Sequence, residues 1–159
     1  MSYHVNPGPN ACFSSSQTQS IVDPTKGQVI TFNTTETANG VSLSGSTKIT
    51  LQQIGKYLFF VSAVCHCTSG SNKSVYIWFK YNGNDVPRSN TLVNIASGNE
   101  QVLSVAFVLP CNTVGDYYEL WMAGDTTNCQ IEALPAVVAP NTPVMPATPS
   151  VVVTVNQVV

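Results

Sequence analysis

Cysteine and histidine are the residues of this chain best suited to metal binding or redox chemistry. The five cysteines are Cys12, Cys65, Cys67, Cys111 and Cys129. Side chains alternate across a β-strand, so Cys65 and Cys67 would share one face and His66 would lie on the other. One ion cannot easily contact all three, and the spacing to Cys111 and Cys129 is not that of a zinc ribbon. We expect buried, reduced thiols and no metal site; a zinc site and a disulfide are the alternatives.

The other polar residues show no catalytic arrangement. The two histidines, His4 and His66, are far apart in the sequence. Asp116 and Glu119 would face opposite sides of a strand, and Asp116 fits better as a turn residue before that strand. The chain has no serine nucleophile elbow, phosphate-binding loop or dinucleotide motif. We therefore expect no enzyme, no catalytic residue and no cofactor.

Aromatic side chains are the remaining candidates for ligand recognition. Seven of them occupy predicted strand positions: Tyr57, Phe59, Tyr76, Trp78, Tyr117, Tyr118 and Trp121. Such rings can stack on sugars at a glycan site, but aromatic residues in strands more often fill a core or a subunit interface. We expect these residues to make core or trimer contacts, with a glycan site as the alternative.

The composition predicts a surface with few charges. Charged residues make up 9% of the chain, against roughly 25% in ordinary globular proteins. No run of Lys or Arg suits nucleic acid, and no apolar stretch reaches the ~20 residues of a membrane helix. The first residues lack the apolar core of a signal peptide. We expect no nucleic-acid or membrane partner, folding in a cytoplasm, and a surface that can be buried against neighbours at low desolvation cost.

Short strands separated by turn residues predict an all-β fold. Residues 74–81 form the clearest strand, because Val75, Ile77 and Phe79 would share one face. Residues 55–67 contain a continuous apolar run, which is typical of a strand covered on both faces. Further strands are predicted at residues 28–33, 41–43, 47–51, 91–95, 101–109, 117–123 and 130–133. This pattern favours a two-sheet antiparallel jelly roll.

The two ends of the chain differ from its middle. Proline and glycine interrupt residues 1–27, which predicts an extended N-terminal arm. Residues 28–134 would form the jelly-roll domain. In residues 135–159, prolines recur at every third position, as in a polyproline II spacer, and a β-prone valine-rich strand follows.

We interpret these end segments as an assembly tether. Its predicted residues are Phe13, Pro140, Pro143, Pro146, Pro149, Val151, Val153 and Val155. The terminal strand would pair with the edge of its own sheet or with that of a neighbour. If this segment is a tether, deletion of residues 136–159 would leave a folded domain that joins its assembly poorly. If the terminal strand is instead an ordinary edge strand of its own sheet, the same deletion would unfold the domain.

Three segments of the sequence resemble C1q/TNF-like jelly rolls: residues 55–62, 75–91 and 115–121. The likeness is closest to short versions in virion proteins of tailed phages and large DNA viruses. Those proteins often open with a stretch similar to residues 13–19 and close on a strand similar to residues 149–155. The resemblance covers residues 11–159.

The resemblance implies a ten-strand jelly roll that forms a homotrimer through aromatic and aliphatic faces. It leads us to expect a non-enzymatic virion structural protein: a minor capsid, vertex, decoration or fibre protein that contacts other capsid or virion proteins and is assembled in the host cytoplasm. The alternative is a fibre head that binds a host surface glycan or receptor. A secreted TNF/C1q-like signalling ligand is a third class, which the lack of a signal peptide disfavours.

Overall fold

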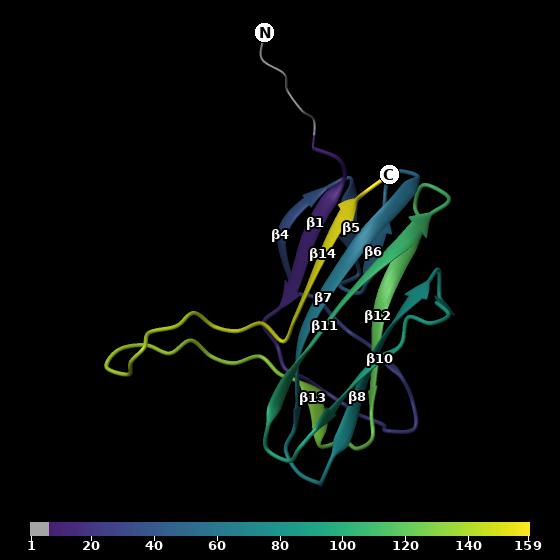
Figure 1. Ribbon diagram of the computed structural model, residues 1–159. Helices are drawn as coiled ribbons and strands as arrows, with labels where there is room; N and C mark the ends of the chain where they lie inside the picture. The colour runs from purple at the N-terminus through teal and green to yellow at the C-terminus, as the bar shows by residue number, and fades with distance from the viewer. Residues whose placement is uncertain (1–6) are drawn as a thin grey trace.

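The protein is a β-sandwich of two antiparallel sheets, as seen in a computed structural model that describes residues 7–159 (Figure 1). The strands are β1 (Asn10–Ser15), β2 (Gln19–Ser20), β3 (Gln28–Val29), β4 (Thr34–Asn39), β5 (Val41–Ser44), β6 (Lys48–Leu51), β7 (Gly55–Cys67), β8 (Lys73–Tyr81), β9 (Asn84–Asp85), β10 (Thr91–Ile95), β11 (Glu100–Cys111), β12 (Tyr117–Gly124), β13 (Cys129–Ile131) and β14 (Val151–Gln157). The described residues form no helix, and none could provide a long apolar helix of the kind that crosses a membrane. The expected two-sheet jelly roll is confirmed.

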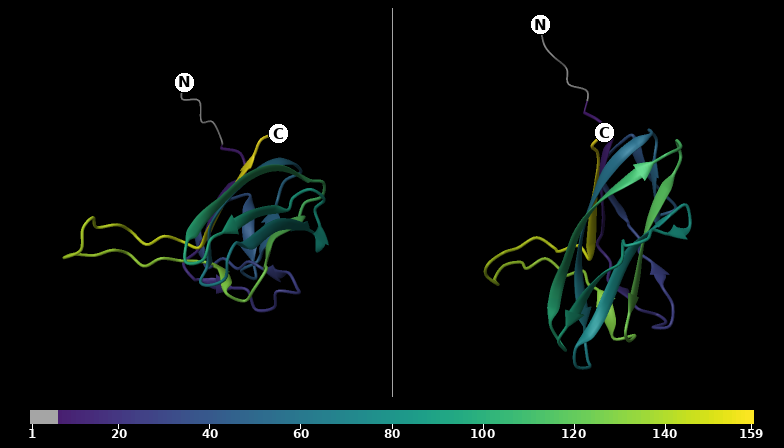
Figure 2. Two further views of the ribbon diagram at one scale, coloured as in Figure 1. Left: turned by 60° about the horizontal axis from the view of Figure 1, so that its bottom comes forward. Right: turned by 45° about the vertical axis from the view of Figure 1, so that its right-hand side comes forward.

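The long strand β7 organises the first sheet. The strand order is β2-β13-β7-β14-β1-β4, and β11 pairs with the other side of β7. On the side opposite β11, residues 57–63 of β7 pair with β14 and residues 65–67 pair with β13. The second sheet has the order β10-β8-β12-β6-β5, with β3 beside β12 and β9 beside β8. The two layers are seen from other directions in Figure 2.

The core lies between the sheets and consists of alternate residues from each inner strand. Phe59 of β7 packs edge-on against Phe79 of β8, with ring centroids 5.4 Å apart. It also contacts Tyr118 of β12 at 5.0 Å. Tyr57 is fully buried, and its hydroxyl donates a hydrogen bond to the carbonyl oxygen of Gln53 at 2.8 Å. Aromatic edge-to-face pairs of this kind add stability beyond the area that they bury.

Two strands from outside the predicted domain, β1 and β14, lie inside the first sheet, so the predicted domain boundaries at residues 28 and 134 are wrong. β14 lies between β1 and β7 (Figure 1); it pairs with β7 over its whole length and with β1 from Val151 to Asn156. Phe13, Val151, Val153 and Val155 are completely buried. The physical reason is the alternation of side chains along both strands, which turns Ala11 and Phe13 of β1 and alternate valines of β14 into the core. Residues 1–6 of the predicted arm lie outside the described residues.

The proline-rich segment between β13 and β14 is a protruding loop, which we call the proline loop (residues 135–149). It extends away from the sandwich and returns to it (Figures 1 and 2). Two isolated bridges, Leu134 with Thr148 and Val137 with Met145, hold its arms antiparallel. The expected single polyproline II rod is therefore wrong, because the segment folds back on itself. Pro140, Pro143, Pro146 and Pro149 all belong to this loop.

The cysteines are not all free thiols. Cys67, at the end of β7, forms a disulfide with Cys129 of β13, and these two residues are directly paired in the sheet. Cys12, Cys65 and Cys111 are free. The expectation of five reduced thiols is thus wrong for one pair. The sheet register brings together two cysteines that are 62 residues apart in the chain.

Candidate functional site on the outer sheet faces

The outward face of the first sheet is the most distinctive surface of the molecule. The inward residues of β7 alternate with side chains that point away from the core. Sheet register aligns these with outward residues of β11 and β14; for example, Phe60 lies opposite Ala106 and Thr154. We call this surface the outer apolar face. It consists of Leu58, Phe60, Ser62, Val64, Val102, Ser104, Ala106, Val108, Val152 and Thr154.

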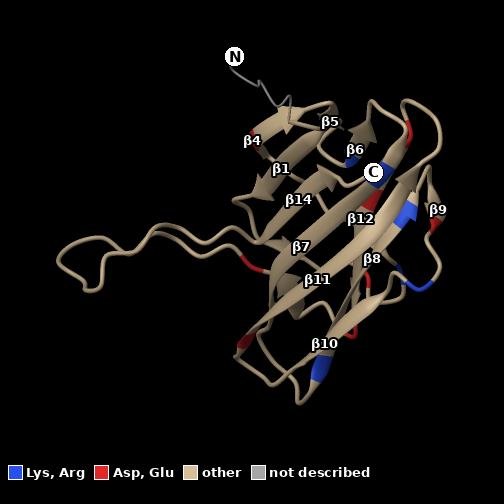
Figure 3. Ribbon diagram, turned by 45° about the horizontal axis from the view of Figure 1, so that its top comes forward, with Lys and Arg blue, Asp and Glu red and all other residues tan. Residues whose placement is uncertain are grey.

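The outer apolar face carries no charged residue and exposes large apolar side chains. Phe60 is 46% exposed, Val102 63% and Val108 58%. Figure 3 shows that the charged residues of β7 and β11 lie near the ends of these strands and not along their middle. Exposed apolar side chains gathered on one face indicate an interaction surface, since single soluble domains rarely leave such patches uncovered.

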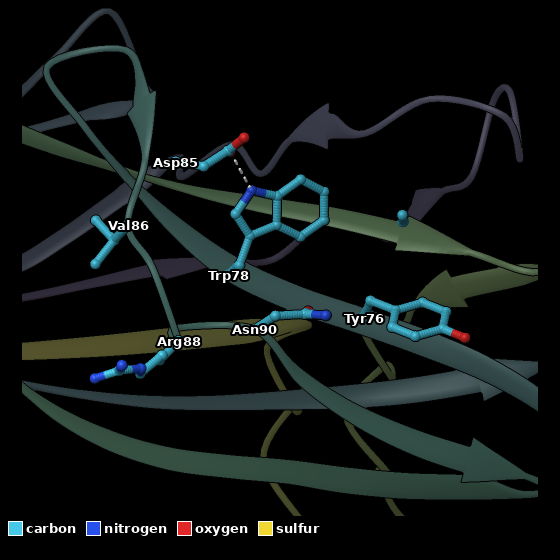
Figure 4. Close-up of a pocket in the computed structure, with 7 residues that line it drawn as sticks. Tyr76, Trp78, Asp85, Val86, Arg88 and Asn90 are labelled. Atoms are coloured by element: carbon cyan, nitrogen blue, oxygen red, sulfur yellow. Dashed lines mark hydrogen bonds between the residues drawn. The ribbon is translucent and has the colours of Figure 1, made fainter.

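The second sheet carries a shallow pocket on its outward face, lined mainly by β8 and the segment after it. Its volume is about 340 Å³. The lining residues are Tyr76, Trp78, Asp85, Val86, Arg88, Asn90 and Ala123 (Figure 4). An aromatic surface beside exposed guanidinium and amide groups is suited to stacking on a ring and to hydrogen bonding with its substituents.

Local contacts fix the indole ring of Trp78 in this pocket. Its Nε1 donates a hydrogen bond to Oδ1 of Asp85 at 2.8 Å, drawn as a dashed line in Figure 4. The ring of Trp121 lies 6.4 Å away between centroids. Gly27 packs against the indole so closely that a Cβ atom there would lie 2.6 Å from the ring. The amine of Lys80 lies 4.0 Å from the centroid of the Trp121 ring, a cation–π contact. The aromatic surface is therefore rigid before any ligand arrives.

The seven aromatic residues expected to form the core or a trimer contact fall into two groups. Tyr57, Phe59 and Tyr118 are buried between the sheets. The other four are half-buried on the outward face of the second sheet: Tyr76, Trp78, Tyr117 and Trp121. The structure places none of the seven on the outer apolar face. Phe60 and the valines of β11 were not singled out, although the strict alternation of β7 was a signal that Phe60 points away from Phe59.

Asp116 is a structural residue at one end of the sandwich. Its carboxylate accepts hydrogen bonds from the hydroxyl of Tyr81, from Nδ2 of Asn82 at 2.9 Å, and from the backbone amides of Asn112 and Thr113, each at 2.9 Å. Burial alone would raise the pKa of Asp116, but these hydrogen bonds outweigh it and lower the pKa to about 2. The carboxylate thus ties the turn after β8 to the turn before β12, as expected for a turn residue.

The Cys65-His66-Cys67 sequence does not form one site. Cys65 points into the core, where burial raises the pKa of its thiol to about 12, so that the thiol is protonated and inert. Cys67 is part of the disulfide. His66 lies on the opposite face, as the alternation of the strand predicts. Of these three residues, only His66 lies outside both the core and the disulfide.

Comparison with solved structures supports the fold and nothing finer. Neither a protein-family model nor a curated protein sequence matches the chain. Its structure is similar to that of the globular domain of zebrafish complement 1qA protein, with a TM-score of 0.54. The match covers 96% of this chain and 98% of that one, at 13% sequence identity. The protein therefore has a C1q/TNF-like jelly-roll fold.

Proposed function

We propose that the protein is a non-enzymatic structural subunit of a virus particle that assembles as a homotrimer through its outer apolar face. The outer apolar face, a stretch of β7, β11 and β14 without charged residues, is the observation that carries this proposal. The apolar run of β7 is typical of a strand covered on both faces, yet in the single chain only the inner face is covered. A second copy of the same chain supplies the missing cover.

The chemistry of the outer apolar face favours another copy over a charged partner. The cores of subunit interfaces are depleted in charged residues and rich in aromatic and aliphatic ones. The outer apolar face shows this composition, with Phe60 near its middle and valines around it. In a closed ring of three subunits each copy would turn this face toward the threefold axis, where the neighbouring copies cover it through head-to-tail contacts.

The assignment to a virus particle rests on the sequence resemblance and on the proline loop. The two stretches that carry the likeness to virion proteins, residues 13–19 and 149–155, overlap with β1 and β14, which pair with each other. The proline loop projects from the sandwich (Figure 2) and offers an exposed contact to neighbouring capsid proteins. If the assignment holds, the chain will co-sediment with intact particles from its source.

Substitution Val102→Asp should convert the trimer to a monomer. A charge at this 63% exposed position would be buried without a partner when the outer apolar faces meet. In the free subunit the same side chain is in water, so folding should be unaffected. Sedimentation velocity over a range of protein concentrations measures the change.

Val114→Asp is the matched control, because Val114 is 61% exposed in the turn between β11 and β12, outside the outer apolar face. The control should remain trimeric. A wild-type chain that stays monomeric at all concentrations would contradict the proposed assembly. So would a Val102→Asp protein that is still a trimer.

A second candidate function is that of a fibre head that binds a host surface glycan or receptor. The pocket beside Trp78 favours it, because a rigid aromatic ring lies next to the exposed Arg88 and Asn90. Sugar rings present an apolar face that stacks on indole and hydroxyls that bind guanidinium and amide groups.

If this pocket binds sugars, Arg88→Ala should reduce binding on a glycan array and leave the fold intact. Lys26→Ala is the matched control, since Lys26 is also an exposed cation but does not line the pocket. Equal signals from the two variants, or no signal from the wild-type protein, would reject the pocket as a glycan site and leave the trimer proposal untouched.

A further inference from the structure

Three strands of the first sheet bring a histidine and two glutamates together beside the outer apolar face. Glu100 of β11 lies directly opposite His66 of β7. On the other side of β7, Gln130 of β13 lies opposite His66, and Glu132 follows two residues later on the same face. One ligand atom from each of His66, Glu100 and Glu132 lies within 4.8 Å of the others.

The surrounding structure holds this cluster in place. The backbone amide of Glu132 donates a hydrogen bond to the carbonyl oxygen of Val64 at 2.8 Å. The side-chain amide of Gln130 donates to Oε1 of Glu132 at 3.3 Å. One carboxylate oxygen of Glu132 is thus occupied, and Oε2 is directed at His66. Supporting bonds of this kind orient metal-binding carboxylates in proteins.

Two polar atoms at the centre of the cluster lack a hydrogen-bond partner. Nδ1 of His66 and Oε2 of Glu132 lie 2.6 Å apart, within ion-pair distance, and neither atom makes a hydrogen bond. Among the described residues neither atom has another partner, and both are inaccessible to solvent. The two side chains are only 14% and 19% exposed. Buried polar atoms normally have a partner, and a metal ion that draws both atoms into its coordination shell would supply one to each.

We propose that His66, Glu100 and Glu132 form a binding site for a divalent transition-metal ion, with Zn²⁺ as the expected ion. Imidazole and carboxylate together suit Zn²⁺, whereas Mg²⁺ and Ca²⁺ prefer sites made of oxygen alone. Three protein ligands leave a position for water or for a group from a partner. The thiols of Cys65 and Cys67 take no part, because one points into the core and the other is in the disulfide.

The site is peripheral to the fold. The three side chains lie outside the core between the sheets, and Glu100 is exposed. Removal of the metal should therefore leave the domain folded, unlike the case of a zinc finger, in which the metal supplies the folding energy. The proposal is independent of the trimer, because all three ligands come from one chain.

Isothermal titration calorimetry of the chelator-treated full chain with ZnCl₂ tests the site. We expect one Zn²⁺ per chain, and affinity lower in His66→Ala and in Glu132→Gln by more than the roughly 10- to 100-fold that loss of a residue supporting a metal ligand costs. Glu100→Gln should also weaken binding; because Glu100 is exposed, this variant tests the site without disturbing packing. Titration with MgCl₂ should show no binding.

The controls separate this site from other zinc-binding groups. His4→Ala removes the second histidine of the chain, and Cys12→Ser removes the partly exposed free thiol; both variants should bind Zn²⁺ like the wild type. The Co²⁺-loaded protein should show no thiolate charge-transfer band. The proposal is overturned if the wild type does not bind Zn²⁺, which would leave a simple ion pair between His66 and Glu132. It is also overturned if His66→Ala and Glu100→Gln bind normally, or if Cys12→Ser abolishes binding.

Discussion

Deleting residues 150–159 should prevent the domain from folding. The deletion removes β14 from the interior of the first sheet, where it separates β1 from β7. Val151, Val153 and Val155 are fully buried, and each contributes about 1.5–3 kcal/mol through burial. Together they contribute about 5–9 kcal/mol, which is comparable to the roughly 5–15 kcal/mol of a whole domain. Circular dichroism of the truncated chain should show loss of the native sheet.

Two further variants locate the effect in β14. Val153→Asp should unfold the chain as the deletion does, whereas Asn156→Asp, on an exposed residue of the same strand, should not. Replacing residues 135–147 by an Asn-Gly turn should also leave a folded domain, because Leu134 already pairs with Thr148 across the base of the proline loop. A soluble, cooperatively folded chain without β14 would restore the interpretation of this strand as a tether.

Asp116→Asn should lower the free energy of unfolding by about 3 kcal/mol, since hydrogen bonds to a charged group are worth about 1.5–3 kcal/mol each. The amide keeps one acceptor oxygen but turns an NH₂ group toward the donors that Asp116 now satisfies. Urea unfolding at pH 7 measures the loss. Asp23→Asn is the control: Asp23 is more exposed and bonds within its own turn to Thr25, so its change should be small.

The contribution of Asp116 should also depend on pH. Its pKa in the folded state, about 2, is lower than the ordinary value of 3.8, so the unfolded chain takes up the proton first as the pH falls. The stabilisation is therefore complete above about pH 5, and it is lost as the pH falls from about 4 to 2. The wild-type and Asp116→Asn curves should converge at low pH. Curves that remain parallel down to pH 2 would show that Asp116 is not responsible.

The alternation of apolar and polar residues within each segment correctly predicted the inner strands of the sandwich. Residues 55–67 were predicted as one strand and form β7 with the same bounds. Residues 74–81 were predicted as a strand and form most of β8, with Val75, Ile77 and Phe79 buried as expected. Alternation of apolar and polar side chains is a property of each segment alone, so a single sequence contains it.

Features that depend on strand pairing could not be predicted in this way. The sequence of residues 151–157 predicts a strand but does not determine whether that strand lies at a sheet edge or between two other strands. The disulfide between Cys67 and Cys129, and the approach of Glu100 and Glu132 to His66, result from the register of three strands. The polar β4 was missed altogether, because an exposed edge strand without apolar alternation carries no such signal.

The antiparallel pairing of β1 with β14 has a mechanical consequence. Asn10 pairs with Asn156, and the backbone amide of Gln157 donates to the carbonyl oxygen of Pro9, so both ends of the pair leave the sandwich at the same place (Figure 1). A force that pulls β1 and β14 apart from this end would act on their hydrogen bonds one at a time, starting with the Asn10–Asn156 pair. Such a joint yields at low force, however stable the domain is to heat. If the protein is a subunit of a particle, as proposed, it would therefore have to transmit load through a sheet face and not through β1 and β14.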